Sequence, residues 1–436
     1  MRKNEFSIGV LGLWHLGSVY SASLARLGFD VTSFDENKHT INDFRKGKPP
    51  IEEPELKEII SANLGKNLHF TINPKEAIEG KKYVFVTYDV PISEKDEVDL
   101  SVIDRTVKLL SDDLSSNSTV VISSQLPVGY SRKILNFLNK KVKGVNVIYF
   151  PENLRLGTAF VSFLRADRVV VGSNNPKILD EFEKDFSSLS CPFIKLGLES
   201  AEMVKHMLNS YLALMISFSS EMSDLAEILG GNIQEIVVAV KTDRRVSQYA
   251  PLNPGLGFAG GTLGRDIQTL RKLAKKNSYK TLLLDSIYEV NRNRLPYLMG
   301  KIKTELKNLN GKTIGILGLT YKPNTNTLRR SMSIEIAELL KKEGVKIKAF
   351  DPAIKKQVSN YPFIEVLTSL EKFFTKLDMV LLITDWPLFR EIEWKKYSGQ
   401  VRNKLVIDTK NFLDSSIVKN SGFKYQGIGF SKNEEN

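Results

Sequence analysis

One sequence unit occurs twice in the chain and restricts the folds that it can adopt. Residues 7–36 read SIGVLGLWHLG…LGFDVTSFDE, and residues 313–352 read TIGILGLTYKP…EGVKIKAFDP. In each copy a β-rich apolar run ends in Gly-Leu, an amphipathic stretch follows, and a second apolar run ends in Phe-Asp. The second copy has a loop insertion of about ten residues, roughly YKPNTNTLRR. The repeat predicts an α/β protein with two doubly wound, Rossmann-like domains.

Further apolar runs extend this pattern in both halves of the chain. They are continuous and rich in Val and Ile, and helical patterns separate them, which favours parallel sheets covered on both faces. The predicted strands lie at 83–88, 118–123, 145–150 and 168–172 in the first half and at 379–384 and 404–409 in the second.

A long helix is predicted between the two repeats. Residues 199–231 contain no Pro or Gly before the closing Gly-Gly, and their apolar positions cover more than one helix face. Such a helix is buried between domains or at a dimer interface, and we expect both, in a homodimer. The predicted domains are an NAD-binding domain at 1–198, a central helical domain at 199–300 and a nucleotide-sugar-binding domain at 301–436.

Composition narrows the functional classes. The 436 residues carry a net charge of +12, but the lysines are dispersed, which favours solvated faces and sites for small anions over nucleic-acid binding. Cys191 is the only cysteine, so no intramolecular disulfide is expected and a cytoplasmic location is favoured. No apolar run is long enough to cross a bilayer, and the four histidines lack metal-ligand spacing. We therefore expect neither a membrane segment nor a metal.

The stretch GLWHLG (12–17) follows a strand and begins a helix, as a dinucleotide-binding turn does. Gly12 and Gly17 match the G-x-G-x-x-G spacing, whereas Trp14 occupies the middle position. Asp35, at the end of the second strand, suits a ribose 2′-hydroxyl and would repel a 2′-phosphate, which favours NAD over NADP. The alternative is a degenerate turn that binds no dinucleotide.

Essentially the whole chain resembles the UDP-glucose/GDP-mannose dehydrogenase family of nucleotide-sugar dehydrogenases. The resemblance implies an N-terminal NAD domain, a long helix used in dimerisation and a C-terminal domain that helps to hold a nucleotide sugar. Family members typically oxidise a sugar C6 alcohol twice with two NAD, the second time through a cysteine thioester. The pieces that carry the resemblance, besides the first turn, lie at 49–60, 123–135, 151–172, 201–214, 253–270 and 318–331.

The resemblance also shows where this chain departs from the family. In NPGLGFAGGTLGRDIQTL (253–270), the family's nucleophilic cysteine falls on Thr262, its lysine on Arg265 and its aspartate on Asp266. The threonine of another family stretch falls on Gln125, and a glutamate of a third falls on Leu156. A threonine hydroxyl has almost no alkoxide at neutral pH, and no adjacent base is visible in the sequence. Thioester chemistry is therefore in doubt.

The parts needed for oxidising an alcohol to an aldehyde are retained. Lys205 and Asn209 are four residues apart on one face of the long helix, where they can donate to an oxygen that gains negative charge. Asp266 can orient a water or accept the hydroxyl proton. The predicted catalytic residues are thus Lys205, Asn209, Asp266, Thr262 and Glu152.

The resemblance implies two further residue sets. For NAD we expect Gly12, Trp14, His15, Leu16, Gly17, Asp35, Gln125 and Arg265. For the nucleotide sugar we expect Glu152, Leu154, Lys205, Tyr249, Gly257, Phe258, Gly261, Tyr321, Lys322 and Arg329, the last as a phosphate clamp.

The leading interpretation is an NAD-dependent oxidoreductase acting on a UDP-sugar. It would stop after one hydride transfer, giving an aldehyde or a ketone, or would reach the acid through a hydrated aldehyde without a thioester. The alternative is a non-catalytic nucleotide-sugar-binding protein. A nucleic-acid-binding protein ranks last.

Overall fold

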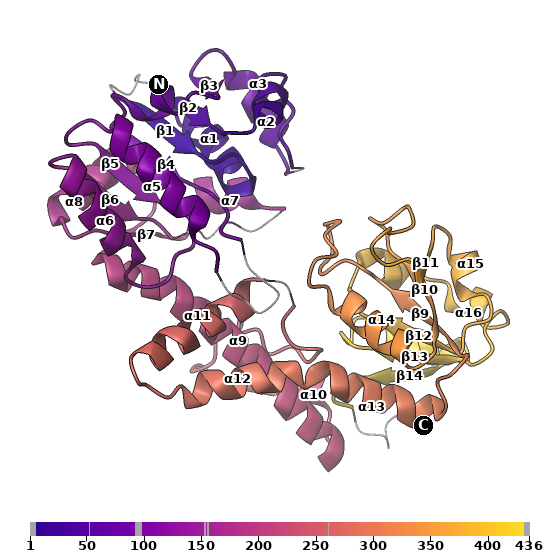
Figure 1. Cartoon of the computed structure of the whole chain (residues 1–436). Helices are drawn as coiled ribbons and strands as arrows, with labels where there is room; N and C mark the ends of the chain where they lie inside the picture. Colours follow the sequence, from indigo (N-terminus) through magenta and orange to yellow (C-terminus); the bar gives the residue numbers. More distant parts are fainter. Residues whose placement is uncertain are drawn as a thin grey trace. The chain divides into compact units, whose positions relative to one another are not determined.

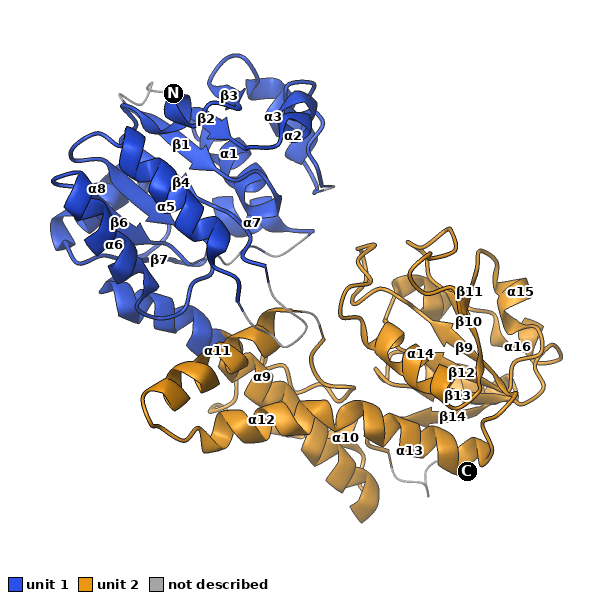
Figure 2. Cartoon of the chain, viewed as in Figure 1, with its two compact units in different colours: residues 1–208 blue, residues 209–436 orange. Residues whose placement is uncertain are grey.

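The computed structural model describes residues 6–51, 53–91, 98–151, 154, 157–259 and 261–430 (Figure 1). The chain forms two compact units, Met1–Leu208 and Asn209–Asn436 (Figure 2). Each unit contains one twisted sheet with helices around it, so the predicted α/β class with two doubly wound, Rossmann-like domains is confirmed.

The first unit is built on a sheet of eight strands. All neighbouring strands are parallel except β6 and β7, which pair antiparallel through Tyr149 and Gly172. The sequence analysis predicted parallel pairing throughout, and at β7 this is wrong. A Val-rich strand that is buried on both faces looks the same in either direction, so its composition does not reveal its orientation. The order is β3 (Leu68–Thr71), β2 (Asp30–Phe34), β1 (Ser7–Leu11), β4 (Tyr83–Val86), β5 (Thr119–Ile122), β6 (Asn146–Tyr149), β7 (Val169–Gly172) and β8 (Phe193–Leu196).

Helices cover both faces of this sheet, because two separate apolar clusters pack against it. One cluster contains side chains of α1, α3, α7 and α8, and the other contains side chains of α4, α5 and α6. Asn-Pro pairs begin α4 and α8, where Asn73 and Asn175 cap the first turn. The helices are α1 (His15–Arg26), α2 (Lys38–Phe44), α3 (Leu56–Asn63), α4 (Pro74–Ile78), α5 (Ser101–Asp113), α6 (Tyr130–Lys141), α7 (Ala159–Leu164) and α8 (Pro176–Asp185).

A single helix of 32 residues, α9 (Leu198–Leu229), follows the first sheet and continues into the second unit. The predicted helix over 199–231 is confirmed, and it ends before Gly230, whose φ of +84° suits glycine. No helix among the described residues combines the length and apolarity needed to cross a membrane. The helices that come next are α10 (Ile233–Lys241), α11 (Thr262–Lys276), α12 (Leu282–Arg292) and α13 (Arg294–Leu306).

The second unit contains a sheet of six strands, all parallel. Two apolar clusters of this unit pack against opposite faces of the sheet. The order is β11 (Ile364–Leu367), β10 (Lys346–Phe350), β9 (Thr313–Leu317), β12 (Met379–Leu382), β13 (Leu405–Asp408) and β14 (Lys424–Gly427). The helices of this sheet are α14 (Met332–Lys342), α15 (Leu370–Phe374), α16 (Trp394–Tyr397) and α17 (Ser415–Asn420).

The repeat predicted from the sequence is confirmed by matching hydrogen bonds. The Gly12 amide donates to Phe34 and the Gly318 amide to Phe350, both over 2.9 Å. In each copy, the amide that follows the glycine donates to the aspartate that ends the second strand. These distances are 2.9 Å to Asp35 Oδ2 and 2.7 Å to Asp351 Oδ2. The paired Gly and Asp therefore tie each first strand to the second at the edge where nucleotides bind in such folds.

Candidate active site

The turn between β1 and α1 requires glycine at two positions. Gly12 has a φ of +95°, and a Cβ on it would lie 2.8 Å from the Tyr88 ring. A Cβ on Gly17 would lie 1.8 Å from the Gly12 carbonyl oxygen and 2.7 Å from Thr87 Oγ1. The helix therefore packs against the strand more closely than any side chain permits, as a dinucleotide turn requires. The structure fits NAD at this turn.

Trp14 stands at the middle position of this turn with a φ of −89° and a ψ of −146°, outside the regular helical and strand regions. The residue is 53% exposed, so its indole is not taken into the core. The Trp14 carbonyl accepts a hydrogen bond from the Ser18 hydroxyl in the first turn of α1. Leu16, by contrast, is buried and anchors the helix to the sheet. The turn thus forms with tryptophan at the position of the middle glycine.

The Asp35 carboxylate is held in place by the backbone. Its Oδ2 accepts from the Leu13 amide and its Oδ1 from the Asn37 amide, each over 2.9 Å. A carboxylate has about four acceptor sites, so these two bonds orient it and leave capacity for a ribose hydroxyl. This arrangement fits the role predicted for Asp35.

A buried carboxylate that the sequence analysis missed supports the same turn. Glu53 accepts from the Gly157 and Ala159 amides over 2.9 and 2.7 Å, and it also contacts His15 Nε2 at 3.2 Å. It thereby joins the start of α1 to the start of α7. The only signal was that Glu53 lies in the stretch 49–60, which resembles the family, and its main-chain partners are distant in sequence.

Three of the predicted catalytic side chains, two on α9 and one on α11, are buried. Lys205 and Asn209 are 8% and 5% exposed, and Asp266 is fully buried. The Asn209 carboxamide donates a short hydrogen bond to Asp266 Oδ2. Arg265 Nε lies 3.6 Å from Asp266 Oδ1, so the carboxylate has a cation beside it. Lys205 and Asn209 therefore do not lie on a solvated face of α9.

Thr262 is exposed and is the first residue of α11, and Gly261 precedes it as the N-cap. The helix dipole would favour a negative charge there. Cys191, the only thiol, instead packs against the core of the first unit, where burial raises its pKa. A higher pKa lowers the thiolate fraction, so Cys191 is not an activated nucleophile.

The second unit has a cavity of about 260 Å³ above the carboxyl ends of β9 and β12. It lies where the strand order reverses direction, the position at which such sheets bind ligands. Gly257, Phe258, Tyr321 and Lys322, four of the predicted substrate residues, line it together. Lys410, which follows β13, also lines it and was missed, because a single lysine after a strand carries no signal of its own.

The loop that supplies Gly257 and Phe258 is fixed by Asn291 of α12. Asn291 Oδ1 accepts from the Phe258 amide over 2.8 Å, and its Nδ2 donates to the Phe258 carbonyl over 3.2 Å. Gly257 has a φ of +83°, and a Cβ on it would lie 2.2 Å from Asn291 Oδ1. Burial raises the pKa of Tyr321, so its phenol stays neutral and can donate.

The other predicted residues are more scattered. Tyr249 is 84% exposed, Arg329 is exposed as well, and neither lines the cavity. Leu154 packs against the core of the first unit, and Gln125 is half-buried after β5. Glu152 lies outside the described residues.

The fold and these features define a nucleotide-binding α/β protein of the dehydrogenase class. Family models match three consecutive segments of the chain. The NAD-binding domain of the UDP-glucose/GDP-mannose dehydrogenase family matches residues 6–189, its central domain 199–293 and its UDP-binding domain 315–415. The chain therefore belongs to the UDP-glucose/GDP-mannose dehydrogenase family, and it is an NAD-dependent dehydrogenase of nucleotide sugars.

Individual relatives match along almost the whole chain. UDP-glucose 6-dehydrogenase of Rickettsia felis is 32% identical over 432 residues, covering 97% of this chain and 96% of the relative. UDP-glucose 6-dehydrogenase TuaD of Bacillus subtilis is 29% identical, covering 97% and 93%. The structure of a UDP-glucose dehydrogenase from Pyrobaculum islandicum has a TM-score of 0.89 at 25% identity, covering 98% and 99%. UDP-D-ManNAc dehydrogenase from Pyrococcus horikoshii has a TM-score of 0.86 at 25% identity, covering 97% and 99%.

Proposed function

We propose that the chain oxidises the C6 alcohol of a UDP-sugar, with NAD as the hydride acceptor. The observation that carries the proposal is the buried pair of Asn209 and Asp266, because a protein that only bound nucleotide sugars would not need it. The relatives named above act on UDP-glucose or UDP-D-ManNAc, so a UDP-hexose is the substrate class we propose. Lys322 and Lys410 at the cavity supply positive charge suited to its diphosphate.

Each residue has a distinct proposed role. Lys205 and Asn209 donate to the sugar oxygen as it gains negative charge. Asp266 accepts the hydroxyl proton, either directly or through a water, while Arg265 beside it balances the charge of its carboxylate. Glu152, Leu154, Tyr249, Gly261 and Arg329 are proposed to contact the substrate, and Gln125 and Arg265 to contact NAD.

We propose a division of labour along the chain as well. Residues 1–198 hold NAD through Gly12, Trp14, His15, Leu16, Gly17 and Asp35. Residues 199–300 supply the catalytic pair, and residues 301–436 help to hold the nucleotide sugar. Because the single cysteine is free, we also propose a cytoplasmic location.

The number of oxidations follows from Thr262. A threonine hydroxyl needs a strong base to act as a nucleophile, and the chain has no activated thiol to replace it. We therefore propose one hydride transfer per sugar, or an oxidation of the hydrated aldehyde that forms no thioester. The test is the amount of NADH formed per UDP-sugar consumed. A ratio near two that persists in Cys191→Ala would contradict the proposal of a single oxidation. If no sugar in a panel of UDP-, GDP- and dTDP-sugars gave NADH, the result would favour a binding protein.

We further propose that the chain forms a homodimer through α9 and α10. Tyr211, Phe218 and Leu225 recur at intervals of seven along α9 and are 50%, 49% and 43% exposed. Leu229 and Val238 extend the apolar surface with exposures of 80% and 67%. Large exposed apolar patches mark protein interfaces, and a seven-residue period suits a helix from a second copy. Light scattering should give twice the mass of 49.2 kDa, and Phe218→Asp should reduce it to that of one chain.

A further inference from the structure

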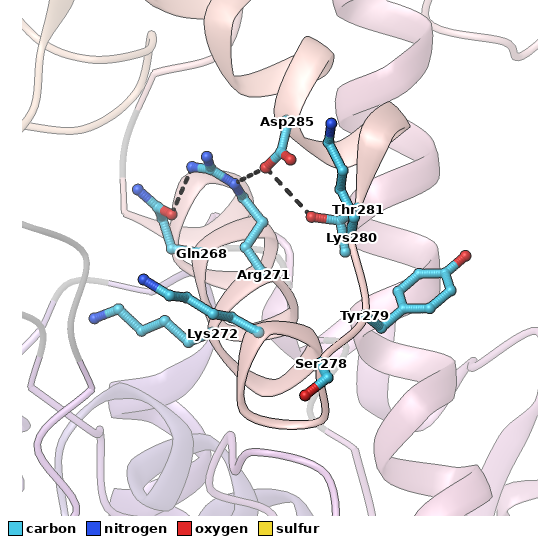
Figure 3. Close-up of a pocket in the computed structure, with 9 residues that line it drawn as sticks. Gln268, Arg271, Lys272, Ser278, Tyr279, Lys280, Thr281 and Asp285 are labelled. Atoms are coloured by element: carbon cyan, nitrogen blue, oxygen red, sulfur yellow. Dashed lines mark hydrogen bonds and ion pairs between the residues drawn. The ribbon is translucent and has the colours of Figure 1, made fainter.

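The second unit has another cavity, of about 510 Å³, apart from the candidate active site. It is formed by the second half of α11, the loop at 277–281 and the start of α12 (Figure 3). Among its lining residues, Gln268, Arg271 and Lys272 project from α11, and Tyr279 and Lys280 lie on the loop that follows (Figure 3). It shares no lining residue with the cavity above β9 and β12.

Positive charge predominates in this cavity. Four cations line it, namely Arg271, Lys272, Lys275 and Lys280, against one carboxylate, that of Asp285. Among the described residues no carboxylate forms an ion pair with Lys275 or Lys280. Like charges gathered on one concave surface repel each other, and a bound anion removes that cost.

The single carboxylate is already engaged. Asp285 accepts from Arg271 Nε and, over 3.3 Å, from the Thr281 hydroxyl (Figure 3). Arg271 also donates to Gln268 over 2.9 Å, and its guanidinium lies 4.8 Å from the centre of the Tyr288 ring. Arg271 is thus held in one orientation before any ligand arrives, which reduces the entropy cost of binding.

We propose that this cavity binds the polyphosphate group of a small molecule, either a nucleoside polyphosphate or free inorganic polyphosphate. Its volume falls within the range of ordinary small-molecule sites. Tyr279 is 71% exposed at its rim and offers an aromatic surface to a base. The cavity lies on α11, the helix that begins at Thr262, so the ligand contacts the helix that carries Asp266, one member of the proposed catalytic pair.

The test is isothermal titration calorimetry of the full-length protein with tripolyphosphate and, separately, with ATP. Saturating NAD and UDP are present so that neither probe competes for the dinucleotide turn or the other cavity. We expect one site per chain, with an affinity that falls as salt is added. Lys275→Gln/Lys280→Gln should weaken binding about tenfold or more, a change of one decade in Kd.

The matched control is Lys140→Gln/Lys141→Gln, which removes two exposed lysines from the end of α6 and changes the net charge equally. It should leave Kd within about twofold, a negligible free-energy change. If ATP binds more tightly than tripolyphosphate, and Tyr279→Ala removes that difference, the ligand is a nucleotide. If both probes bind equally, the ligand is inorganic polyphosphate. Either result supports the site. No heat with either probe, or equal weakening by the two lysine pairs, overturns it. The titration involves no turnover, so failure of the dehydrogenase proposal would not affect its result.

Discussion

The Asn209 carboxamide donates a hydrogen bond to the carboxylate of Asp266, although the two residues are 57 positions apart and lie on different helices. Both side chains are buried. A buried amide and carboxylate fix each other's orientation, because each would otherwise lose its solvent partners without replacement. The pair is therefore set in place before any substrate binds, as its proposed role in stabilising a developing charge requires.

Removing one member of this pair should affect turnover more than binding. We expect Asn209→Ala to lower kcat by about 10²-fold, the usual effect of losing one donor to a developing oxyanion. KM should change little, because the interaction is made mainly in the transition state. Initial rates of NADH formation with a UDP-sugar measure both constants.

The control is Asn277→Ala, at the exposed end of α11, which should behave as the wild type does. Asp266→Asn keeps the volume and removes the charge, and it should lower kcat at least as far. If Asn209→Ala raised KM and left kcat unchanged, the side chain would be a binding group only.

Restoring the thiol should restore the second oxidation. Thr262→Cys places a thiol at the first turn of α11, where the helix dipole lowers a thiol pKa and increases the thiolate fraction. We expect the yield of NADH per UDP-sugar to rise from about one to about two, as expected for a covalent thioester route. Thr262→Ser, which lacks a thiol, should stay near one. Equal yields for the two variants would show that residue 262 does not set the oxidation level.

The repeat and the apolar runs allowed most of the fold to be predicted. In each repeat a glycine, Gly12 or Gly318, follows the first strand, and an Asp follows the second strand. This local pattern predicts a strand–helix–strand unit. The strands β3, β11 and β14 were missed because they are four-residue edge strands, LHFT, IEVL and KYQG, in which polar residues interrupt the apolar run. The antiparallel direction of β7 depends on the path of the chain, which residue types do not encode.

Some residues of the candidate site could likewise be predicted from the sequence, and others could not. Gly257, Phe258, Tyr321 and Lys322 could be predicted because they lie in stretches that resemble the family, although only the fold brings them to one cavity. Glu53 was missed because the two amides that it accepts from are more than a hundred residues away in sequence, and main-chain amides have no residue signature.

The close packing of α1 on β1 predicts a selective loss of NAD binding. Gly17→Ala forces a Cβ to within 1.8 Å of the Gly12 carbonyl oxygen, which is main chain and cannot rotate away. The turn must shift, so we expect the Kd for NAD to rise about tenfold or more and the melting temperature to fall. NAD binding followed by intrinsic fluorescence, together with thermal melting, measures the two effects.

Gly300→Ala is the matched control, because a Cβ there meets no atom within 4 Å and the residue lies inside α13. Alanine in a helix interior is favoured over glycine by about 0.5–1 kcal/mol, so this variant should melt slightly higher. Normal NAD affinity in Gly17→Ala would mean that the turn does not hold the dinucleotide.

Two glutamates one turn apart on α9 should respond to pH in different ways. Glu202 accepts from the Gly129 and Ser131 amides at the start of α6, and burial raises its pKa. A raised folded pKa contributes stability below the unfolded value of about 4.3 and loses it as pH rises through the folded value. The melting temperature of Glu202→Gln relative to the wild type should therefore rise as pH increases above about 4.3.

Glu199 provides the opposite case, because its bidentate pairing with Arg132 over 2.8 and 2.9 Å lowers its pKa. Its contribution is present above about 4.3 and is lost only as pH falls through the lowered folded value. Over the same pH range Glu199→Gln should therefore differ from the wild type by a constant amount. If the melting temperatures of the two variants, relative to the wild type, changed with pH in the same way, burial would not control the ionisation of Glu202. Both glutamates would then behave as ordinary solvated charges where α9 contacts α6.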